Sequence, residues 1–71
     1  MATTGTVKFF NAARGFGFII PDSGGDDLFV HIHSVVDENI DALREGQRVK
    51  FEERPSAKRA GKFEAHQVVV L

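Results

Sequence analysis

Residues 8–18 read KFFNAARGFGF, and residues 29–31 read FVH. Five of the seven phenylalanines of the chain lie in these two stretches. Side chains two positions apart on an extended strand point to the same face of a sheet. Phe16 and Phe18 should therefore share one face, and Phe29 and His31 should do the same on the next strand. The spacing predicts flat rings side by side on the surface of a small sheet.

The alternate positions of the same hairpin are aliphatic, with Ile19, Leu28 and Val30. If the rings were buried as well, both sides of the hairpin would be interior, which a chain this short cannot arrange. We therefore expect the aromatic side to face solvent. Lys8 and Arg14 flank it, and an aromatic surface with basic edges suits the stacking of unpaired bases and the binding of their phosphates. The pattern predicts a protein that binds single-stranded nucleic acid.

The composition limits the other classes of function. The 71 residues are enough for one domain, which spans residues 1–71. Because the chain has no cysteine, it can form neither a disulfide nor a thiolate metal site. Its formal net charge of −1 argues against a binder of duplex DNA, because such domains are usually strongly basic. The N-terminus lacks the features of a signal peptide, and no apolar run approaches the roughly 18 residues that span a bilayer. We expect a cytoplasmic protein that does not bind membranes.

Turn-forming residues divide the chain into short strand patterns. The predicted strands cover residues 6–10, 14–20, 28–33, 48–54 and 63–71. Between the third and fourth, residues 34–47 are expected to contain one short helical turn and a loop. Five strands in so short a chain predict an all-β fold, a partly open barrel of the oligonucleotide- and oligosaccharide-binding (OB) type. The predicted core consists of Val7, Ile19, Leu28, Val30, Val49, Phe51, Val68 and Val70.

The stretch RGFGFI at residues 14–19 matches the ribonucleoprotein motif of RNA-recognition modules. In those modules a second, shorter motif precedes the glycine-rich one, and two helices cover the sheet. Here LFVHI at residues 28–32 follows within a single hairpin, and no long helix is predicted. The order of the motifs therefore excludes the RNA-recognition fold.

Four segments in sequence order identify a different family. They are GTVKFFN (5–11), RGFGFI (14–19), DDLFVH (26–31) and LREGQRVKF (43–51). Together they resemble the bacterial cold-shock proteins over nearly the whole chain. The resemblance implies the cold-shock domain, a small five-stranded antiparallel Greek-key barrel with the OB-fold. It also implies a non-enzymatic protein that binds single-stranded RNA and DNA, serves as an RNA chaperone, and acts in transcription antitermination or in the control of translation under stress.

Carried over position by position, the resemblance implies a nucleic-acid-binding site with no catalytic residue, cofactor or metal. The implied contacts are Lys8, Phe9, Phe16, Phe18, Phe29 and His31, with Arg14 and Asp27 at the edges. Three positions depart from the family: Phe9 stands where most members have tryptophan, and Ile32 and Ile40 stand where many have aromatic residues.

The basic loop at residues 55–62 has two interpretations. Lys58, Arg59 and Lys62 are either solvated side chains or follow the backbone of a bound strand. We include Lys58 and Arg59 among the predicted nucleic-acid contacts.

Other functions explain the same residues less well. His31 and His33 could share a metal ion with Asp26 or Asp27, but two histidines on one strand give only half a site. The histidines could also support ribonuclease chemistry, yet no set of nucleophile and base is apparent. The main alternative is a protein-interaction module whose exposed phenylalanines dock a partner. We expect no small-molecule substrate and a monomer, and the sequence is compatible with a dimer as well.

Overall fold

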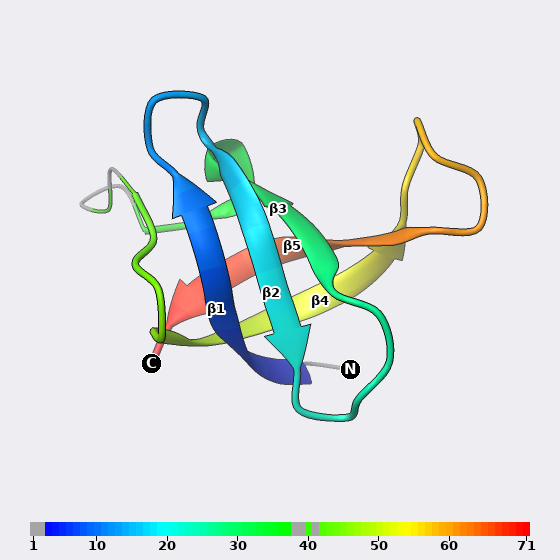
Figure 1. The fold of residues 1–71 in the computed structure, drawn as a ribbon, viewed down its shortest axis with the longest axis horizontal. Coiled ribbons are helices and arrows are strands. Elements are labelled where there is room, and N and C mark those ends of the chain that lie inside the picture. The colour runs from blue at the N-terminus through cyan, green and yellow to red at the C-terminus, as the bar shows by residue number, and fades with distance from the viewer. Residues whose placement is uncertain (1–2, 38–39, 41) are drawn as a thin grey trace.

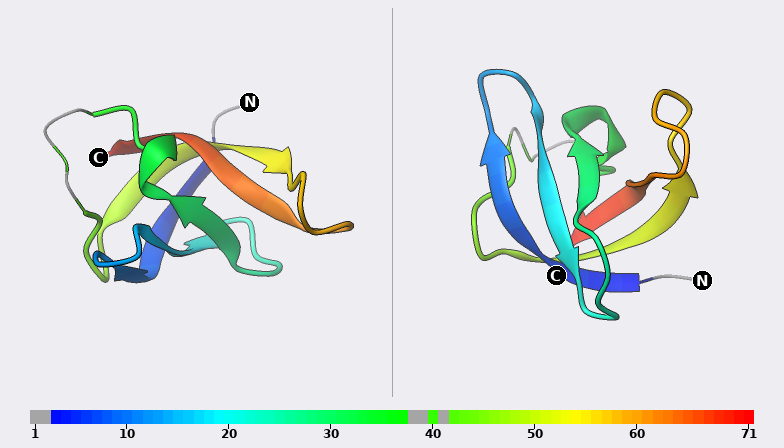
Figure 2. Two further views of the ribbon diagram at one scale, coloured as in Figure 1. Left: turned by 90° about the horizontal axis from the view of Figure 1, so that it is seen from above. Right: turned by 45° about the vertical axis from the view of Figure 1, so that its right-hand side comes forward.

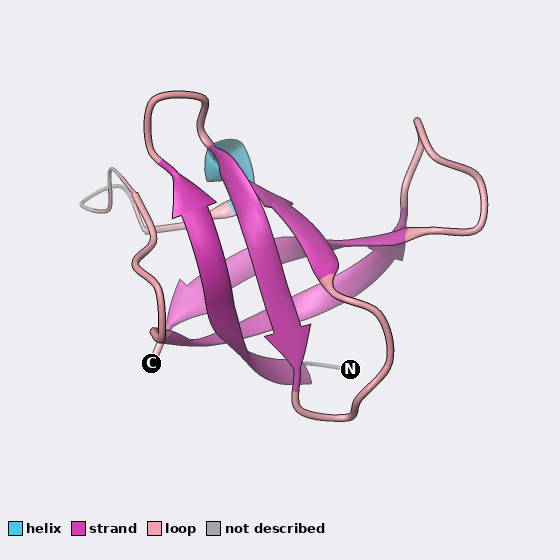
Figure 3. Cartoon of the chain, in the orientation of Figure 1, coloured by secondary structure: helices cyan, strands magenta, loops and turns pink. Residues whose placement is uncertain are grey.

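The computed structural model describes residues 3–37, 40 and 42–71, and strands dominate it (Figure 1, Figure 3). The strands are β1 (Thr3–Asn11), β2 (Phe16–Pro21), β3 (Leu28–His31), β4 (Arg48–Pro55) and β5 (Phe63–Val70). A single turn of 3-10 helix, η1 (Ile32–Ser34), follows β3 directly. The predicted all-β fold is confirmed. No helix in the described residues is long and apolar enough to cross a membrane.

The strands close into a barrel in the order β1-β2-β3-β5-β4 (Figure 2). The first part of β1 pairs with β4 and its later part with β2, and this double pairing joins the two sides of the barrel. The prediction of a partly open barrel is therefore wrong in this detail. β3 and β5 run parallel, whereas all other neighbours are antiparallel. An odd number of strands cannot alternate in direction all the way round a closed ring, so the predicted antiparallel order fails at this one pair.

Among the residues that the structure describes, nine buried hydrophobic side chains form the core of the barrel. They are Val7, Ile19, Leu28, Val30, Leu43, Val49, Phe51, Ala65 and Val68. Every predicted core residue is among them except Val70, which is partly buried and packs against the cluster. Leu43 was not predicted because it lies in the irregular connection before β4, where no strand periodicity marks it.

Ala65 was not predicted because β5 contains a bulge. Lys50 pairs with Val69, but Glu52 pairs with His66, so β5 has one residue more than β4 over this interval. Gln67 has a φ of 53°, in the left-handed region that residues other than glycine rarely adopt. An extra residue of this kind reverses the alternation of a strand, and both Ala65 and Val68 consequently point into the core.

The end of β3 also differs from the prediction. The strand stops at His31 rather than at residue 33, because the chain turns at once into η1. The backbone N–H of His33 donates to Nδ1 of His31 at 3.2 Å, which caps this turn. The helical turn thus lies at residues 32–34 and not within 34–47 as predicted. The described residues between η1 and β4 contain no helix, and residues 38, 39 and 41 lie outside the described part.

β1, β2 and β3 stand side by side and present one continuous outer surface (Figure 2). The loop between β4 and β5 projects beyond the body of the barrel, next to β3 (Figure 1, Figure 2). This arrangement brings the basic loop to the border of the surface on which the predicted aromatic residues lie.

Candidate nucleic-acid interface

The phenylalanine rings of the first three strands form a single surface, called here the aromatic face. It consists of Phe9, Phe16, Phe18, Phe29 and the adjacent His31. The strand register produces it: Phe18 pairs with Phe9 on one side and with Phe29 on the other. Phe16 pairs with His31 in the same way. Side chains directly opposite each other on neighbouring strands lie within contact distance.

The rings support one another. The centroids of Phe9 and Phe18 are 5.4 Å apart, and those of Phe18 and Phe29 are 5.9 Å apart in an edge-on arrangement. Phe16 and Phe29 are nearly parallel, with 5.7 Å between centroids and 22° between planes. Phe18 and Phe29 therefore each contact two other rings and lie at the centre of the face.

The face is open to solvent. Phe9 is 42% exposed, and the other three phenylalanines are half-buried, whereas Ile19 and Val30 on the opposite side of the hairpin are 0% exposed. The predicted separation of aromatic and aliphatic sides is thus confirmed. Because neighbouring rings already hold each other in place, a base that stacks on them immobilises few side-chain rotamers.

Phe9 reaches the aromatic face through a bulge in β1. Val7 pairs with Ile19 and Phe9 pairs with Phe18, so Lys8 is an extra residue between two consecutive pairs. Strict alternation would place Phe9 on the buried side with Val7. The bulge turns Phe9 outward instead, and both Lys8 and Phe9 are exposed.

Gly17 allows β1 and β2 to approach closely under the rings. A Cβ atom at this position would lie 2.2 Å from the carbonyl oxygen of Phe9 and 2.7 Å from the Cα of Phe10. Any side chain would therefore push the two strands apart. The glycines of RGFGFI are expected to let a base or a neighbouring backbone approach closely, and at Gly17 the structure shows that the close neighbour is the backbone of β1.

Lys8 and Asp27 form an ion pair beside the rings. Lys8 Nζ lies 2.9 Å from Asp27 Oδ2, which connects the bulge of β1 to the residue preceding β3. Both side chains are partly exposed, at 54% and 33%. The family resemblance implies both residues as contacts without predicting that they pair. A phosphate that binds Lys8 must compete with this carboxylate.

Arg14 lies in the turn between β1 and β2, next to Phe16. Its backbone N–H donates to Asn11 Oδ1 at 3.1 Å, and the N–H of Gly15 donates to the carbonyl oxygen of Asn11 at 2.7 Å. Gly15 has a φ of 75°, which favours glycine. These contacts fix the turn and leave the Arg14 side chain exposed at the edge of the aromatic face.

Two residues of the β4–β5 loop reach the aromatic face. The guanidinium carbon of Arg59 lies 5.5 Å from the centroid of the Phe29 ring. Lys58 and Arg59 also line a cavity of about 430 Å³ together with Phe29 and His31. The structure therefore brings both predicted loop residues to the predicted aromatic residues.

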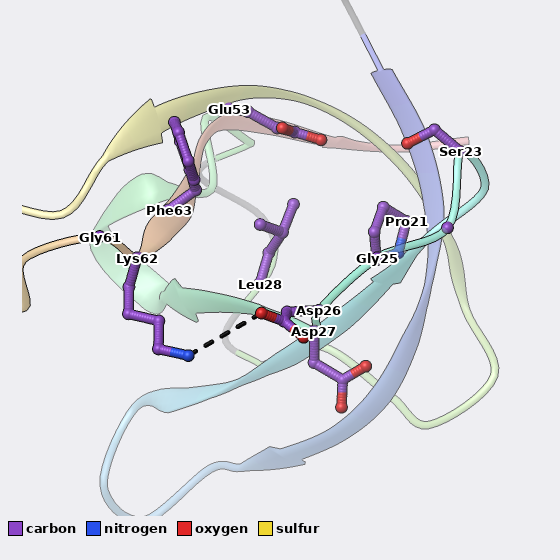
Figure 4. Close-up of a pocket in the computed structure, with 11 residues that line it drawn as sticks. Pro21, Ser23, Gly25, Asp26, Asp27, Leu28, Glu53, Gly61, Lys62 and Phe63 are labelled. Atoms are coloured by element: carbon purple, nitrogen blue, oxygen red, sulfur yellow. Dashed lines mark ion pairs between the residues drawn. The ribbon is translucent and has the colours of Figure 1, made fainter.

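Lys62 of the same loop points elsewhere. Its Nζ lies 3.8 Å from Asp26 Oδ2, and Figure 4 shows the two side chains directed toward each other across the space between the loops. This space is a second cavity, lined also by Pro21, Leu28 and Phe63. Lys62 is thus separated from Lys58 and Arg59, with which the sequence grouped it.

The two histidines near β3 contact each other, with 4.7 Å between ring centroids. His31 Nδ1 already accepts the N–H of His33. The described residues contain no group of three histidines or carboxylates that could hold a metal ion. His31 lines the cavity beside Phe29 and lies on the aromatic face.

The two isoleucines at the family's aromatic positions have different surroundings. Ile32 is half-buried, and its side chain would be 3.1 Å from a Cβ atom on Gly15. Ile40 packs against the hydrophobic core. Ile32 thus borders the turn beside the aromatic face, whereas Ile40 contributes to the packing of the barrel.

Sequence reasoning missed Glu64 and Ser56, which line the cavity beside Phe29. Glu64 is the parallel register partner of Phe29, across the β3–β5 pair. The two residues are far apart in the chain, and only the closure of the barrel brings them together. A local pattern in the sequence cannot show such a contact.

A charge cluster away from the aromatic face stabilises the strand ends. Arg48 of β4 donates to both carboxylate oxygens of Asp22, at 2.7 and 2.5 Å, and Thr4 donates its hydroxyl to the same carboxylate at 2.6 Å. The Arg48 guanidinium and then the Thr4 hydroxyl hold the pKa of Asp22 well below its ordinary value. Hydrogen bonds to a charged carboxylate favour its ionised form.

The comparison with known protein families assigns this arrangement. Residues 3–71 match the family described as the "Cold-shock" DNA-binding domain. The chain belongs to this family. The cold-shock resemblance inferred from the four sequence segments is thereby confirmed, and so is nucleic acid as the class of partner.

Named relatives support the same assignment. The cold shock-like protein CspG of Shewanella violacea is 55% identical over 51 residues, which cover 72% of this chain and 73% of that protein. The cold shock-like protein CspA of Vibrio cholerae is 58% identical over 48 residues, or 68% of this chain and 69% of that protein. The cold shock protein CapA of Pseudomonas fragi is 54% identical over 48 residues, with 68% and 75% covered.

Proposed function

We propose that this cold-shock domain binds single-stranded RNA and DNA by stacking bases on the aromatic face, and that it is not an enzyme. The observation that supports the proposal is the row of contacting rings on β1, β2 and β3, of which Phe29 contacts two others. Each ring can stack one base, whatever its identity, because every base has a π-face. Lys8, Arg14, Lys58 and Arg59 surround the rings and supply positive charge for the phosphates.

Binding of this kind makes the protein a passive RNA chaperone. Bases that open transiently from a hairpin would be captured on the rings, and the captured strand could not re-pair. By the same means the protein would prevent a terminator hairpin from forming in a nascent transcript or expose a site for translation. These regulatory roles follow from the capture of single strands and need no additional chemistry at the protein.

The first test compares single and double strands of one sequence. The chain has neither tryptophan nor tyrosine, so a fluorescent label on the oligonucleotide is the suitable probe. Anisotropy titrations should show saturable binding of a labelled oligothymidine and much weaker binding of a duplex, because paired bases do not offer their faces. Equal affinity for both would contradict base stacking. The absence of any saturable response would favour a protein-docking role for the aromatic face.

The second test measures chaperone action. An RNA hairpin with a fluorophore and a quencher at its ends should open at a lower temperature when the protein is added without ATP. Phe29→Ala should abolish most of this effect, while Phe63→Ala should retain it. Phe63 is a matched control because it is exposed on β5 and lines the other cavity, away from the aromatic face. Equal loss in both variants would contradict the proposed surface.

A further inference from the structure

The cavity beside Phe29 has the composition of a site for a single base. Phe29 provides a ring, Arg59 provides a planar guanidinium 5.5 Å from that ring, and Glu64 contributes a carboxylate. Aromatic rings and guanidinium planes are the two surfaces on which proteins stack unpaired bases. Ser56, Ala57 and Lys58 of the β4–β5 loop complete the wall.

Glu64 is held in a defined position in this cavity. Its backbone is fixed by the register between β5 and β3, where it pairs with Phe29. Glu64 Oε1 lies 2.9 Å from His66 Nε2, and the two side chains are only 26% and 31% exposed, respectively. Within the described residues, Oε2 has no hydrogen-bond partner in the protein. One carboxylate oxygen is thus anchored and the other remains available to a ligand.

A carboxylate in this place is unsuited to a phosphate. It would repel the nucleic-acid backbone, which Lys58 and Arg59 of the same cavity attract. An ionised carboxylate only accepts hydrogen bonds. The complementary part of a nucleic acid is therefore an amino group on the edge of a base.

We propose that Glu64 is a specificity-determining residue that selects a base with an exocyclic amino group, so that cytosine is preferred to uracil or thymine. The proposal rests on the proposed binding of single strands. The N4 amino group of cytosine can donate to Glu64 while the ring stacks on Phe29. Uracil has the size of cytosine and thymine adds only a methyl group, but both place a carbonyl oxygen at this position, and two acceptors would then face each other.

The test compares the affinities of oligocytidine and oligothymidine of equal length for the full chain. The measurements belong at about pH 7.5, where cytosine is neutral. Glu64→Gln keeps the shape of the side chain and adds a donor for the carbonyl of thymine. We expect the preference for cytosine over thymine to fall at least about fivefold in this variant, consistent with the usual worth of one base contact. An unchanged ratio would overturn the proposal.

Glu45→Gln is the matched control. It removes the same charge in the turn before β4, and Glu45 does not line this cavity. It should leave the ratio between the two oligonucleotides unchanged. A similar change in both variants would show a general effect of charge and would also overturn the proposal.

A modified ligand provides a test that does not depend on the folding of a variant. In an oligocytidine whose N4 atoms carry two methyl groups, no amino hydrogen remains. Its affinity for the wild-type chain should fall to that of oligothymidine or below, and retention of the full cytosine affinity would contradict the role of Glu64. If no oligonucleotide binds saturably, the proposed function itself fails. If oligonucleotides bind but the base preference does not respond to Glu64, only the present inference fails.

Discussion

The guanidinium carbon of Arg59 lies 5.5 Å from the centroid of the Phe29 ring, so the β4–β5 loop reaches over the centre of the aromatic face. Guanidinium groups are attracted to the electron-rich face of an aromatic ring. A base that stacks on this side of Phe29 must displace the guanidinium, which can then stack on the outer face of the base. The loop residues around Arg59 are exposed, so this movement disturbs no part of the core.

Arg59→Ala should therefore lower the affinity for single strands by about 0.5–1 kcal/mol, the usual strength of an exposed cation–π contact. Arg59→Lys should recover only part of the loss, because an ammonium group retains the charge without the planar stacking surface. Anisotropy titrations of both variants with a labelled oligothymidine make the comparison. Full recovery by lysine would show that charge alone explains the role of this residue.

Phe29→Ala should weaken the binding of single strands. Phe29 contacts Phe16 and Phe18, so its removal deletes one stacking surface and loosens two others. We expect a loss of about 1–3 kcal/mol in binding free energy, the range for one stacked base. The control is Phe63→Ala, which removes an equally large but separate exposed ring.

The stability of these variants tests the orientation of the hairpin. Phe29→Ala should change the free energy of unfolding little, since the ring is half-buried on the outer face. Val30→Ala should destabilise the barrel more, because Val30 is completely buried. Circular dichroism during thermal unfolding distinguishes the two. If Phe29→Ala lowered the stability of the barrel and Val30→Ala did not, the assignment of Phe29 to the outer face and Val30 to the core would be wrong.

The hairpin of β2 and β3 could be predicted because its alternation is regular. Aromatic and buried aliphatic side chains alternate along both strands, as Phe18 and Ile19 do in β2 and Phe29 and Val30 do in β3. The alternation of side chains along a strand therefore assigns both faces of the hairpin. Phe9 and Ala65 do not follow this rule, because β1 and β5 each contain a bulge that changes which face the alternate side chains point to. Bulges depend on how a strand pairs with its neighbours, and a single sequence does not show that pairing.

Contacts across the closed barrel could not be predicted either. Glu64 and Phe29 are register partners, and Lys8 and Asp27 form an ion pair, but neither pair is near in sequence. The family resemblance placed Lys8 and Asp27 at the site as separate residues. Only the three-dimensional arrangement shows that Asp27 offsets the charge of Lys8.

Gly17→Ala should destabilise the barrel severely. The added Cβ would lie 2.2 Å from the Phe9 carbonyl oxygen, a backbone atom that cannot rotate away. We expect a loss of about 3 kcal/mol or more in the free energy of unfolding, the upper end for an overpacked interior.

Gly24→Ala is the control, because its Cβ would meet nothing within 4 Å although its φ is 88°. It should cost only about 1–2 kcal/mol of backbone strain. Denaturant unfolding followed by circular dichroism measures both, and equal losses would contradict the close approach of β1 and β2.

The pair of Asp22 and Arg48 should make stability depend on acid pH. The pKa of Asp22 is lowered in the folded protein by Arg48 and Thr4, so the folded state binds this proton less readily than the unfolded state. The stabilisation is present above the ordinary carboxyl pKa of 3.8 and is lost as the pH falls below it. In thermal unfolding from about pH 6 to pH 2, the wild type should lose more of its Tm than Asp22→Asn. The two curves should approach each other toward the acid end without meeting at pH 2, because the folded-state pKa of Asp22 is well below its ordinary value, and Arg48→Ala should flatten the curve in the same way. Parallel curves would contradict the pairing.

Salt should weaken binding only moderately. The logarithm of the affinity for single strands falls with the logarithm of the salt concentration by about 0.7 for each phosphate neutralised. The candidate phosphate contacts are few, namely Lys8, Arg14, Lys58 and Arg59, in a chain with a formal net charge of −1. We therefore expect a slope of roughly two to four for oligothymidine. A slope steeper than about five would mean that electrostatic attraction, and not stacking, provides most of the affinity.

Lys8 and Arg14 should contribute unequally to that slope. Lys8 Nζ is 2.9 Å from Asp27 Oδ2, so part of its charge is already offset before a phosphate arrives. Arg14 is exposed in the β1–β2 turn, and its side chain makes no ion pair among the described residues. Arg14→Ala should lower the slope by about 0.7, and Lys8→Ala by clearly less.

In the Asp27→Asn background Lys8 has no carboxylate partner, so Lys8→Ala should then lower the slope as much as Arg14→Ala does. Titrations of the four variants across one salt series measure this difference. Equal effects of Lys8 and Arg14 in the presence of Asp27 would show that the ion pair does not persist in solution.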